Sequence, residues 1–237
     1  MTMLVTQWVK VALGSALFAG IMASVAPAHA ATVTLANSSF EQGTISRPRG
    51  FVNNLTFNQL NTTAPGWDVF NGLQGWTVSG GGGNRIELRS DKSTSVDAQN
   101  GDYYLSLDTG NGRNSTISQS VTLSAGRYVL SFWYSPESAI VATNTIGYNL
   151  GNLISGNVSV GTNGASVGVW TEVRQTFTVL TGASLGLSFS ALGGADGVGG
   201  YIDNVSIAVA SVPVPASGLV LISALGGLLG LRRRRRA

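Results

Sequence analysis

The sequence contains no cysteine and only one histidine, His29. The absence of cysteine excludes disulfide bonds and thiol chemistry. His29 lies in an N-terminal segment that has the features of a cleaved signal peptide, so the body of the chain also lacks histidine. Serine–histidine and cysteine–histidine nucleophile pairs, and the usual zinc and copper sites, are therefore excluded.

Basic residues are scarce in the body of the chain. Lys10 belongs to the N-terminal segment and five arginines end the chain, which removes six of the 14 basic residues from the body. The remaining eight stand against 11 acidic residues, so the body is acidic although the whole chain has a pI of about 9.5. No basic stripe remains, and the sequence predicts no nucleic-acid partner.

Carboxylates are the catalytic groups that this inventory leaves. A glycan hydrolase or lyase that uses two carboxylates is one hypothesis for the function. Its candidate residues are Glu41, Glu87, Asp102, Asp108, Glu137 and Glu172. Their spacing does not pair them, and scattered solvated carboxylates are the simpler interpretation.

The N-terminus carries an export signal. Lys10 precedes an apolar run from residue 11 to 25, and Ala28-His29-Ala30 has the small-x-small pattern that signal peptidase recognises. We expect cleavage before Ala31, with residues 1–30 as the signal peptide and signal peptidase as a partner.

The C-terminus, residues 212–237, combines three features in a fixed order. A short motif, Val212, Pro213, Val214, Pro215 and Ala216, is followed by an apolar run from residue 217 to 231 and then by Arg232, Arg233, Arg234, Arg235 and Arg236. Together with the motif, the stretch from residue 212 to 231 has about the length that crosses a bilayer as a helix. The positive-inside rule predicts that the arginines stay cytoplasmic and that everything before Val212 lies outside the inner membrane.

This tail resembles the PEP-CTERM class of sorting signals, in its Val-Pro-Leu-Pro-Ala variant, with Val214 in place of leucine. The resemblance implies an exosortase-type protease that cuts at the motif. The precursor would then be anchored in the inner membrane by a transmembrane sorting helix, and the processed protein would lie at the cell surface or outside the cell. An ordinary C-terminal membrane anchor is the alternative.

Residues 31–211 show the alternation of β-strands. Alternating apolar and polar residues extend over 103–107, 117–123, 128–134, 173–179, 185–191 and 201–209, and the segments between them are rich in Gly, Asn, Asp and Ser. No helical period appears in the body. The pattern predicts one all-β domain, an antiparallel two-sheet sandwich of the jelly-roll type.

Four motifs resemble the galactose-binding-like jelly rolls, which include carbohydrate-binding modules. They are residues 37–41 (NSSFE), 75–76 (GW), 126–132 (GRYVLSF) and 201–205 (YIDNV). The resemblance implies that the first and last strands lie close together, often with a structural calcium ion, and frequently that the ligand is a glycan.

Strand parity suggests glycan-binding residues. If residues 128, 130, 132 and 134 face the core, Trp133 points outward, and Tyr104 should likewise lie opposite Leu105. Trp67, in a long loop, is a further candidate. Packing under a loop or a second layer is the alternative interpretation for these rings.

A structural calcium site is the last candidate. Asp203 falls on the apolar side of the final strand, where an unpaired carboxylate would cost several kcal/mol. The resemblance places Glu41 nearby, and a calcium ion between the two carboxylates, with help from Asn37, would relieve their repulsion. A hydrogen-bonded cap on Asp203 is the alternative.

Three functions therefore remain open. The first is an exported, non-catalytic surface or extracellular-matrix protein, processed at its tail and associated with exopolysaccharide. The second is a lectin-like carbohydrate-binding module, and the third is the carboxylate-only hydrolase or lyase.

Overall fold

A computed structural model describes residues 32–43, 50–80, 82–109 and 113–210. The signal peptide, the sorting motif, the apolar run and the arginine cluster lie outside these residues, so those predictions stay predictions. Within the described ranges, no helix is long and apolar enough to cross a membrane.

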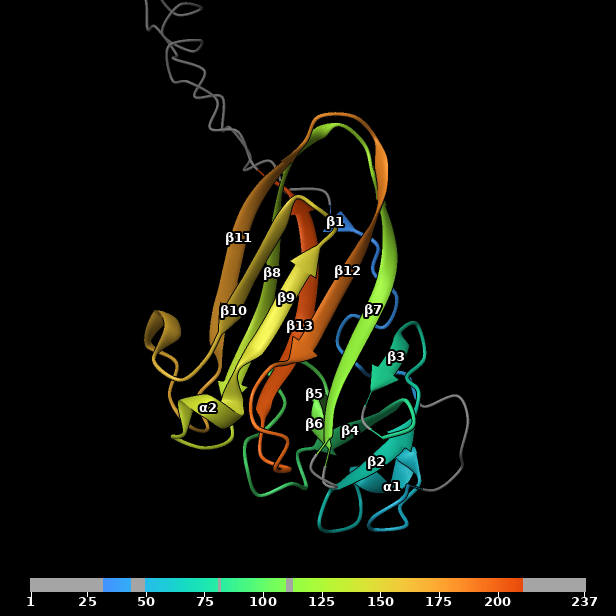
Figure 1. Cartoon of the computed structure of the whole chain (residues 1–237). Coiled ribbons are helices and arrows are strands. Elements are labelled where there is room, and N and C mark those ends of the chain that lie inside the picture. The colour runs from blue at the N-terminus through green and yellow to red at the C-terminus, as the bar shows by residue number, and fades with distance from the viewer. Residues whose placement is uncertain (1–31, 44–49, 81, 110–112, 211–237) are drawn as a thin grey trace, which may run out of the picture.

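Two antiparallel sheets make up the body, as the alternation predicts (Figure 1). The seven-stranded sheet has the order β11 (Thr171–Val179), β8 (Gly126–Pro136), β13 (Gly200–Val209), β5 (Tyr103–Ser106), β4 (Arg85–Ser90) and β2 (Trp67–Asn71), and β1 (Thr32–Val33) pairs with β13. The six-stranded sheet has the order β10 (Ile154–Val158), β9 (Ile146–Leu150), β12 (Ala183–Ala191), β7 (Arg113–Leu123) and β3 (Thr77–Gly80), and β6 (Asp108–Thr109) pairs with β7.

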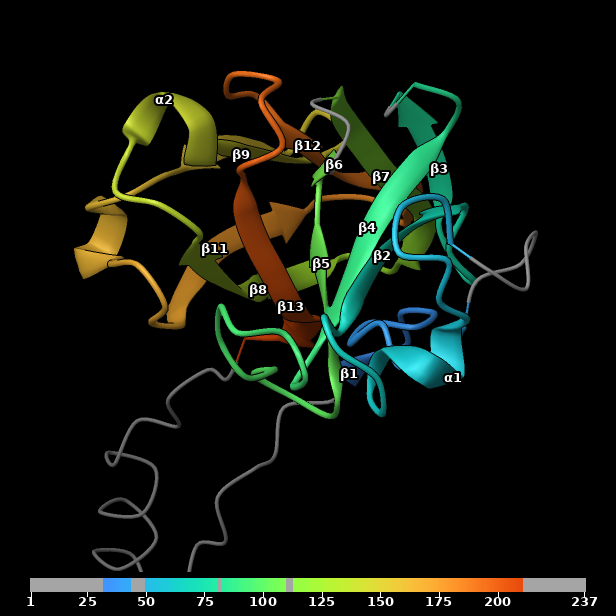
Figure 2. The same cartoon turned by 90° about the horizontal axis from the view of Figure 1, so that it is seen from below.

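The core lies between the two sheets, which Figure 2 shows from below as two layers. Tyr128, Leu130, Phe132 and Tyr134 of β8 are all buried in it, and the ring of Phe132 lies 4.9 Å from that of Phe189 in the opposite sheet. The predicted parity of β8 is confirmed, because a strand sends alternate side chains to opposite faces.

The first and last described strands are neighbours. Thr32 pairs with Ala208 and Val33 with Ile207, and the Val205 amide donates to the Ser38 carbonyl at 2.9 Å. The described chain therefore enters and leaves the body side by side, at the end opposite α1 (Phe57–Leu60) and α2 (Val141–Asn144) (Figure 1).

The predicted alternation of the last strand is wrong in one respect. The register of β13 against β8 shifts between Asp203 and Ser206, and Asn204 has a left-handed φ of 48°. This β-bulge inserts a residue and resets the parity. Ile202 packs in the core before the bulge and Val205 packs there after it, so Asp203 points away from the core.

Several elements were not expected from the sequence. α1, α2 and the 3₁₀ turn η1 (Thr162–Gly164) contain three or four residues each, too few to show a helical period. β9 and β10 were also missed, because glycine and asparagine interrupt their apolar residues.

Candidate functional site

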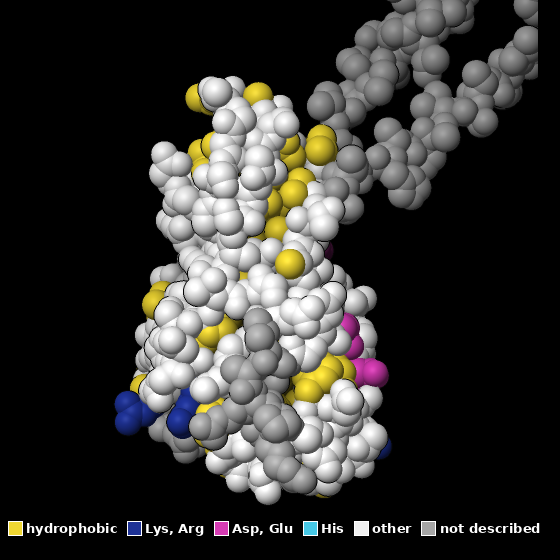
Figure 3. Space-filling model, turned by 90° about the vertical axis from the view of Figure 1, so that its right-hand side faces the viewer, with side chains coloured by type: hydrophobic (Ala, Val, Ile, Leu, Met, Phe, Trp, Pro, Cys, Tyr) yellow, Lys and Arg dark blue, Asp and Glu magenta, His cyan; other side chains and the backbone are white. Residues whose placement is uncertain are grey.

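Charge is divided unequally between the two sheets. The strands β10, β9, β12, β7 and β3 together carry one charged residue, Arg113 at the start of β7. The strands of the seven-stranded sheet carry Asp68, Arg85, Glu87, Arg89, Arg127, Glu172, Arg174 and Asp203. Uncharged side chains and backbone dominate the view in Figure 3, on the side of β7 and β3. The outer face of the six-stranded sheet is therefore polar but nearly neutral.

A shallow groove of about 330 Å³ lies on that face, over β9, β10 and β12. Two rows of paired residues form its floor. They are Ser190–Gly147–Asn157 and Ser188–Asn149–Ser155, and Leu192 closes one end. Gly147 makes the hollow, because it has no side chain between Ser190 and Asn157. A Cβ there would lie 2.7 Å from Cδ1 of Leu192.

The groove offers hydrogen-bonding groups that the protein itself does not use. Ser190 is engaged, since its hydroxyl accepts a hydrogen bond from Thr116 at 2.8 Å. The side chains of Asn149, Asn157 and Ser188 have no hydrogen-bond partner within the described part of the chain. Amides and hydroxyls both donate and accept, so the groove matches a neutral ligand with many hydroxyl groups.

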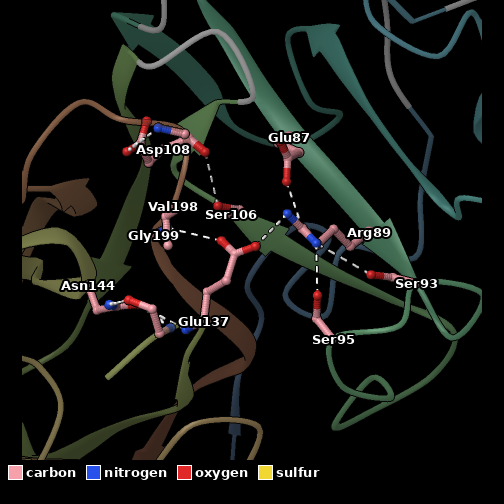
Figure 4. Close-up of polar contacts among 12 residues, drawn as sticks. Glu87, Arg89, Ser93, Ser95, Ser106, Asp108, Glu137, Asn144, Val198 and Gly199 are labelled. Carbon is pink, nitrogen blue, oxygen red and sulfur yellow. Dashed lines mark hydrogen bonds and ion pairs between the residues drawn. The ribbon is translucent and has the colours of Figure 1, made fainter. Parts of the chain in front are cut away.

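The outer face of the other sheet carries a buried charge cluster around Arg89 (Figure 4). The Arg89 guanidinium donates to Glu87 at 2.6 Å, to Glu137 at 2.9 Å and to Ser95 at 3.0 Å. Glu137 in turn accepts from the Gly199 amide, and its own amide donates to Asn144. The cluster ties together β4 and the loops that follow β4, β8 and β12.

This arrangement does not favour the carboxylate-only enzyme. Glu87 and Glu137 both form ion pairs with the Arg89 guanidinium, and Glu87 is fully buried. Glu172 pairs with Arg174 on β11, and Glu41 accepts backbone amides. A general acid and a general base need access to a substrate, and Glu87 has none.

The rings predicted to bind a glycan all lie on the outer face of the seven-stranded sheet, but one of them is not accessible. Tyr104 is fully buried, 5.7 Å from the ring of Trp170 and 5.1 Å from that of Tyr201. Burial raises the pKa of Tyr104 to about 12. The expected exposure of Tyr104 is corrected, because Trp170, whose Nε1 donates to the Asp97 carbonyl at 2.7 Å, packs against it.

Trp67 and Trp133 are half-buried. Trp67 lies 5.4 Å from the Arg89 guanidinium, where it helps to enclose the charge cluster. Trp133 stands between Glu172 of β11 and Asp203 of β13, its cross-strand partners. It remains the one predicted ring that faces outward without such a partner ring or guanidinium in the described contacts.

The three residues of the predicted calcium site are engaged in separate contacts. Asp203 is fully buried and accepts hydrogen bonds from Ser39 and from the amides of Gln99, Asn100 and Asn204. Glu41 accepts from the amides of Asp102 and Tyr103.

Asn37, the third residue, is used by the loops around it. Its side-chain amide donates to the carbonyls of Gln42 and Gln74, and its Oδ1 accepts from the Gln42 amide. The donors around Asp203 form the hydrogen-bonded cap of the alternative interpretation, and the calcium ion between Asp203 and Glu41 stays a prediction. No cluster of three or more His, Cys, Asp or Glu side chains in the described ranges is arranged to hold a metal ion.

The groove residues were missed in the sequence, although a signal for them exists. No charged residue occurs from 138 to 171 or from 175 to 195, and these two stretches include β9, β10 and β12. A long, uncharged stretch rich in serine, threonine and asparagine, inside a body that otherwise carries charges, indicates a neutral outer face on β9, β10 and β12.

Comparison with known proteins gives no family. No family model matches the sequence, and no curated protein matches it. Among solved structures, the chain is similar to TmCBM61 in complex with beta-1,4-galactotriose, at 23% identity and a TM-score of 0.45, over 58% of this chain and 90% of that one.

Two further structures show the range of the likeness. An apo form cyclase from Fischerella sp. matches at 15% identity and a TM-score of 0.46, over 78% of this chain and 98% of that one. A family 35 carbohydrate binding module from Clostridium thermocellum matches at 15% identity and a TM-score of 0.36, over 61% and 93%. Likeness at this level assigns neither a family nor a function.

Proposed function

We propose that this protein is an exported, non-catalytic surface protein of the jelly-roll type that binds a neutral polysaccharide in the groove over β9, β10 and β12. The observation that carries the proposal is that the side chains of Asn149, Asn157 and Ser188 line the groove without a hydrogen-bond partner among the described residues. A saccharide replaces the water on such groups with hydroxyls that donate and accept in the same way.

The absence of charge in the groove sets the ligand class. The strands that form it carry no charged side chain. A uronate or sulfated chain would lose hydration there without gaining a cationic partner, which costs free energy. A neutral chain loses only hydroxyl hydration, which Asn149, Asn157 and Ser188 can replace.

Export and attachment follow from the two ends of the sequence. The signal peptide of residues 1–30 and the sorting tail of residues 212–237 would deliver the body to the outside, where signal peptidase and an exosortase-type protease act on it. Exopolysaccharide at the cell surface or in the extracellular matrix is the polymer that such a protein would meet.

Affinity electrophoresis tests the binding function. The exported protein is run through native gels that contain a neutral polysaccharide, such as dextran, galactan or a soluble glucan, or an acidic one, such as alginate. We expect retardation in at least one neutral gel and none in alginate. The double variant Asn149→Ala, Asn157→Ala should lose the retardation and keep its melting temperature, because both side chains lie at the surface and bond to no other described residue.

Thr77→Ala is the matched control, since Thr77 is an exposed polar residue on β3 of the same sheet, outside the groove. It should be retarded like the wild type. The proposal is wrong if no neutral polysaccharide retards the wild type, or if the double variant is retarded as strongly as the control.

A further inference from the structure

Asp108 and Asn114 form a direct cross-strand pair at the end of the six-stranded sheet. Asp108 in β6 is opposite Asn114 in β7. Residues that face each other across antiparallel strands send their side chains to the same face, with Cβ atoms roughly 5 Å apart. Figure 4 shows Asp108 beside the cluster around Arg89, with its carbonyl oxygen bonded to Ser106.

Each of these two side chains holds one buried oxygen without a partner among the described residues. Asp108 is 1% exposed. Its Oδ2 accepts hydrogen bonds from the amides of Asp196 and Gly197 at 3.1 Å, while its Oδ1 accepts none from the described part of the chain. The Asn114 amide nitrogen donates to the Gly193 carbonyl at 2.8 Å, which fixes the orientation of the amide and leaves its Oδ1 buried and unpartnered. A buried acceptor without a partner costs about 1–3 kcal/mol.

A second acidic residue, Asp196, contacts Asp108. Its amide donates to Asp108 Oδ2 at 3.1 Å, and its own Oδ1 accepts the Val198 amide at 3.1 Å. Burial is the main cause that raises the pKa of Asp108 to about 6, and the negative charge of the neighbouring Asp196 adds to this effect. The loop that carries Asp196 also approaches Asp108 closely at Gly199. Gly199 has no side chain, and a Cβ there would lie 2.9 Å from the Cβ of Asp108. These contacts bring Asp108, Asn114 and Asp196 to the same end of the six-stranded sheet, where the two carboxylates repel each other.

We propose that Asp108, Asn114 and Asp196 bind a calcium ion. Calcium accepts a mixture of carboxylate, amide and carbonyl oxygens in irregular geometry, and takes six to eight of them, so loop carbonyls and water can complete the set. Magnesium demands a near-ideal octahedron and keeps most of its own water, which suits a pair of buried acceptors poorly. The ion offsets the repulsion between Asp108 and Asp196 and gives both unpartnered oxygens a ligand.

The site would fix the loop between β12 and β13. Asn114 holds Gly193, and Asp108 holds Asp196 and Gly197, so the ion joins β6 and β7 to both halves of this loop. Leu192, at the start of the loop, closes one end of the groove. The cation site is separate from the groove, and its test does not depend on glycan binding.

The experiment measures the thermal midpoint of the exported protein in calcium chloride, magnesium chloride and EDTA, together with terbium luminescence excited through the aromatic residues. We expect calcium to raise the midpoint above that in EDTA, magnesium to have little effect, and terbium luminescence that calcium displaces. Asp108→Asn and Asp196→Asn should each lose the calcium response and the luminescence. Asp196 is exposed, so the second variant should fold even if the first does not.

Asp203→Asn and Glu41→Gln are the controls, because they alter acidic residues that lie outside the proposed site and should keep the calcium response. Equal midpoints of the wild type in calcium and EDTA, without luminescence, would overturn the proposal. A midpoint that rises on acidification but not with calcium would assign a shared proton to Asp108 and Asp196 instead. A calcium response that survives in both Asp108→Asn and Asp196→Asn would also overturn it.

Discussion

Asp203 in the last strand and Glu41 in the segment that follows β1 hold backbone amides on either side of Gly101, at the end of the loop between β4 and β5. Asp203 accepts the amides of Gln99 and Asn100, and Glu41 accepts those of Asp102 and Tyr103. Gly101 between them has a φ of 79°, and a Cβ there would lie 2.3 Å from the Glu41 carboxyl carbon. The two carboxylates that the sequence predicts to share an ion are also joined through the backbone of this loop.

Asp203→Ala should destabilise the protein. The substitution leaves the buried amides of Gln99, Asn100 and Asn204 without their acceptor, which costs roughly 1–3 kcal/mol in the free energy of unfolding. Urea denaturation gives the free energy, and hydrogen exchange should show faster exchange at Gln99 and Asn100. Asp97→Ala, an exposed acidic residue in the same loop, is the control and should change the free energy by less than about 0.5 kcal/mol. Equal stability of the two variants would contradict the role of Asp203.

Stability should fall as the pH rises from about 4 to 7. Burial raises the pKa of Asp203 to about 7 and that of Asp108 to about 6, and it also raises the pKa of Glu41. A carboxyl whose pKa is higher in the folded state than in the unfolded chain favours folding when it is protonated. This contribution is complete below the unfolded pKa, near 4, and is lost as the pH passes the folded value. Melting curves in EDTA should give a higher midpoint at pH 5 than at pH 8, whereas a higher midpoint at pH 8 would contradict the assignment.

Arg89 should be far more important for stability than Arg174. Arg89→Met leaves the buried Glu87 carboxylate without its guanidinium, and breaking a buried ion pair in this way costs roughly 3–5 kcal/mol. Arg174→Met removes a pair whose arginine side chain is 60% exposed, which is worth about 1 kcal/mol or less. Chemical denaturation of both variants measures the difference. Equal losses of unfolding free energy in the two variants would show that the buried cluster around Arg89 does not stabilise the fold more than an exposed ion pair does.

The sequence predicts the strands well because each alternation is local. The parity of β8 depends on successive residues, and the core positions from Tyr128 to Tyr134 follow directly. The parity of β13 fails at Asn204, because one left-handed residue inserts a bulge that no apolar pattern marks. Asp203 was therefore placed on the wrong face, although its need for a partner was predicted correctly.

The candidate sites were harder to predict because they depend on contacts between distant segments. Tyr104 points away from Leu105 as expected, but Trp170, which is 66 positions further along the chain, covers its ring. The groove requires the register that places Gly147 between Ser190 and Asn157. The same holds for Asp108 and Asn114, whose unpartnered oxygens are known only once both side chains are placed.

Trp133→Ala separates the groove from the site that strand parity predicts. Trp133 and the groove lie on the outer faces of opposite sheets, so one saccharide chain in the groove does not contact the ring. We expect this variant to be retarded like the wild type in neutral polysaccharide gels, with a modest loss of stability because the ring is half-buried. Retardation that Trp133→Ala abolishes, and that Asn149→Ala with Asn157→Ala leaves intact, would move the glycan site to the seven-stranded sheet.

Processing at the tail predicts a defined change of mass. In the described part of the body, β1 and the end of β13 lie side by side, away from α1 and α2 (Figure 1). A membrane span that follows β13 would therefore attach to the body on the side away from α1 and α2. We expect intact-mass analysis of exported protein from the native host to show a chain that begins at Ala31 and has lost Arg232 to Arg236 with most of the apolar run.

Replacing Pro213 and Pro215 with alanine should leave the full-length tail in the membrane fraction, because the motif would no longer be recognised. Ser211→Ala, just before the motif, is the control and should be processed normally. Exported wild-type protein that keeps the five arginines would contradict processing and leave the ordinary anchor.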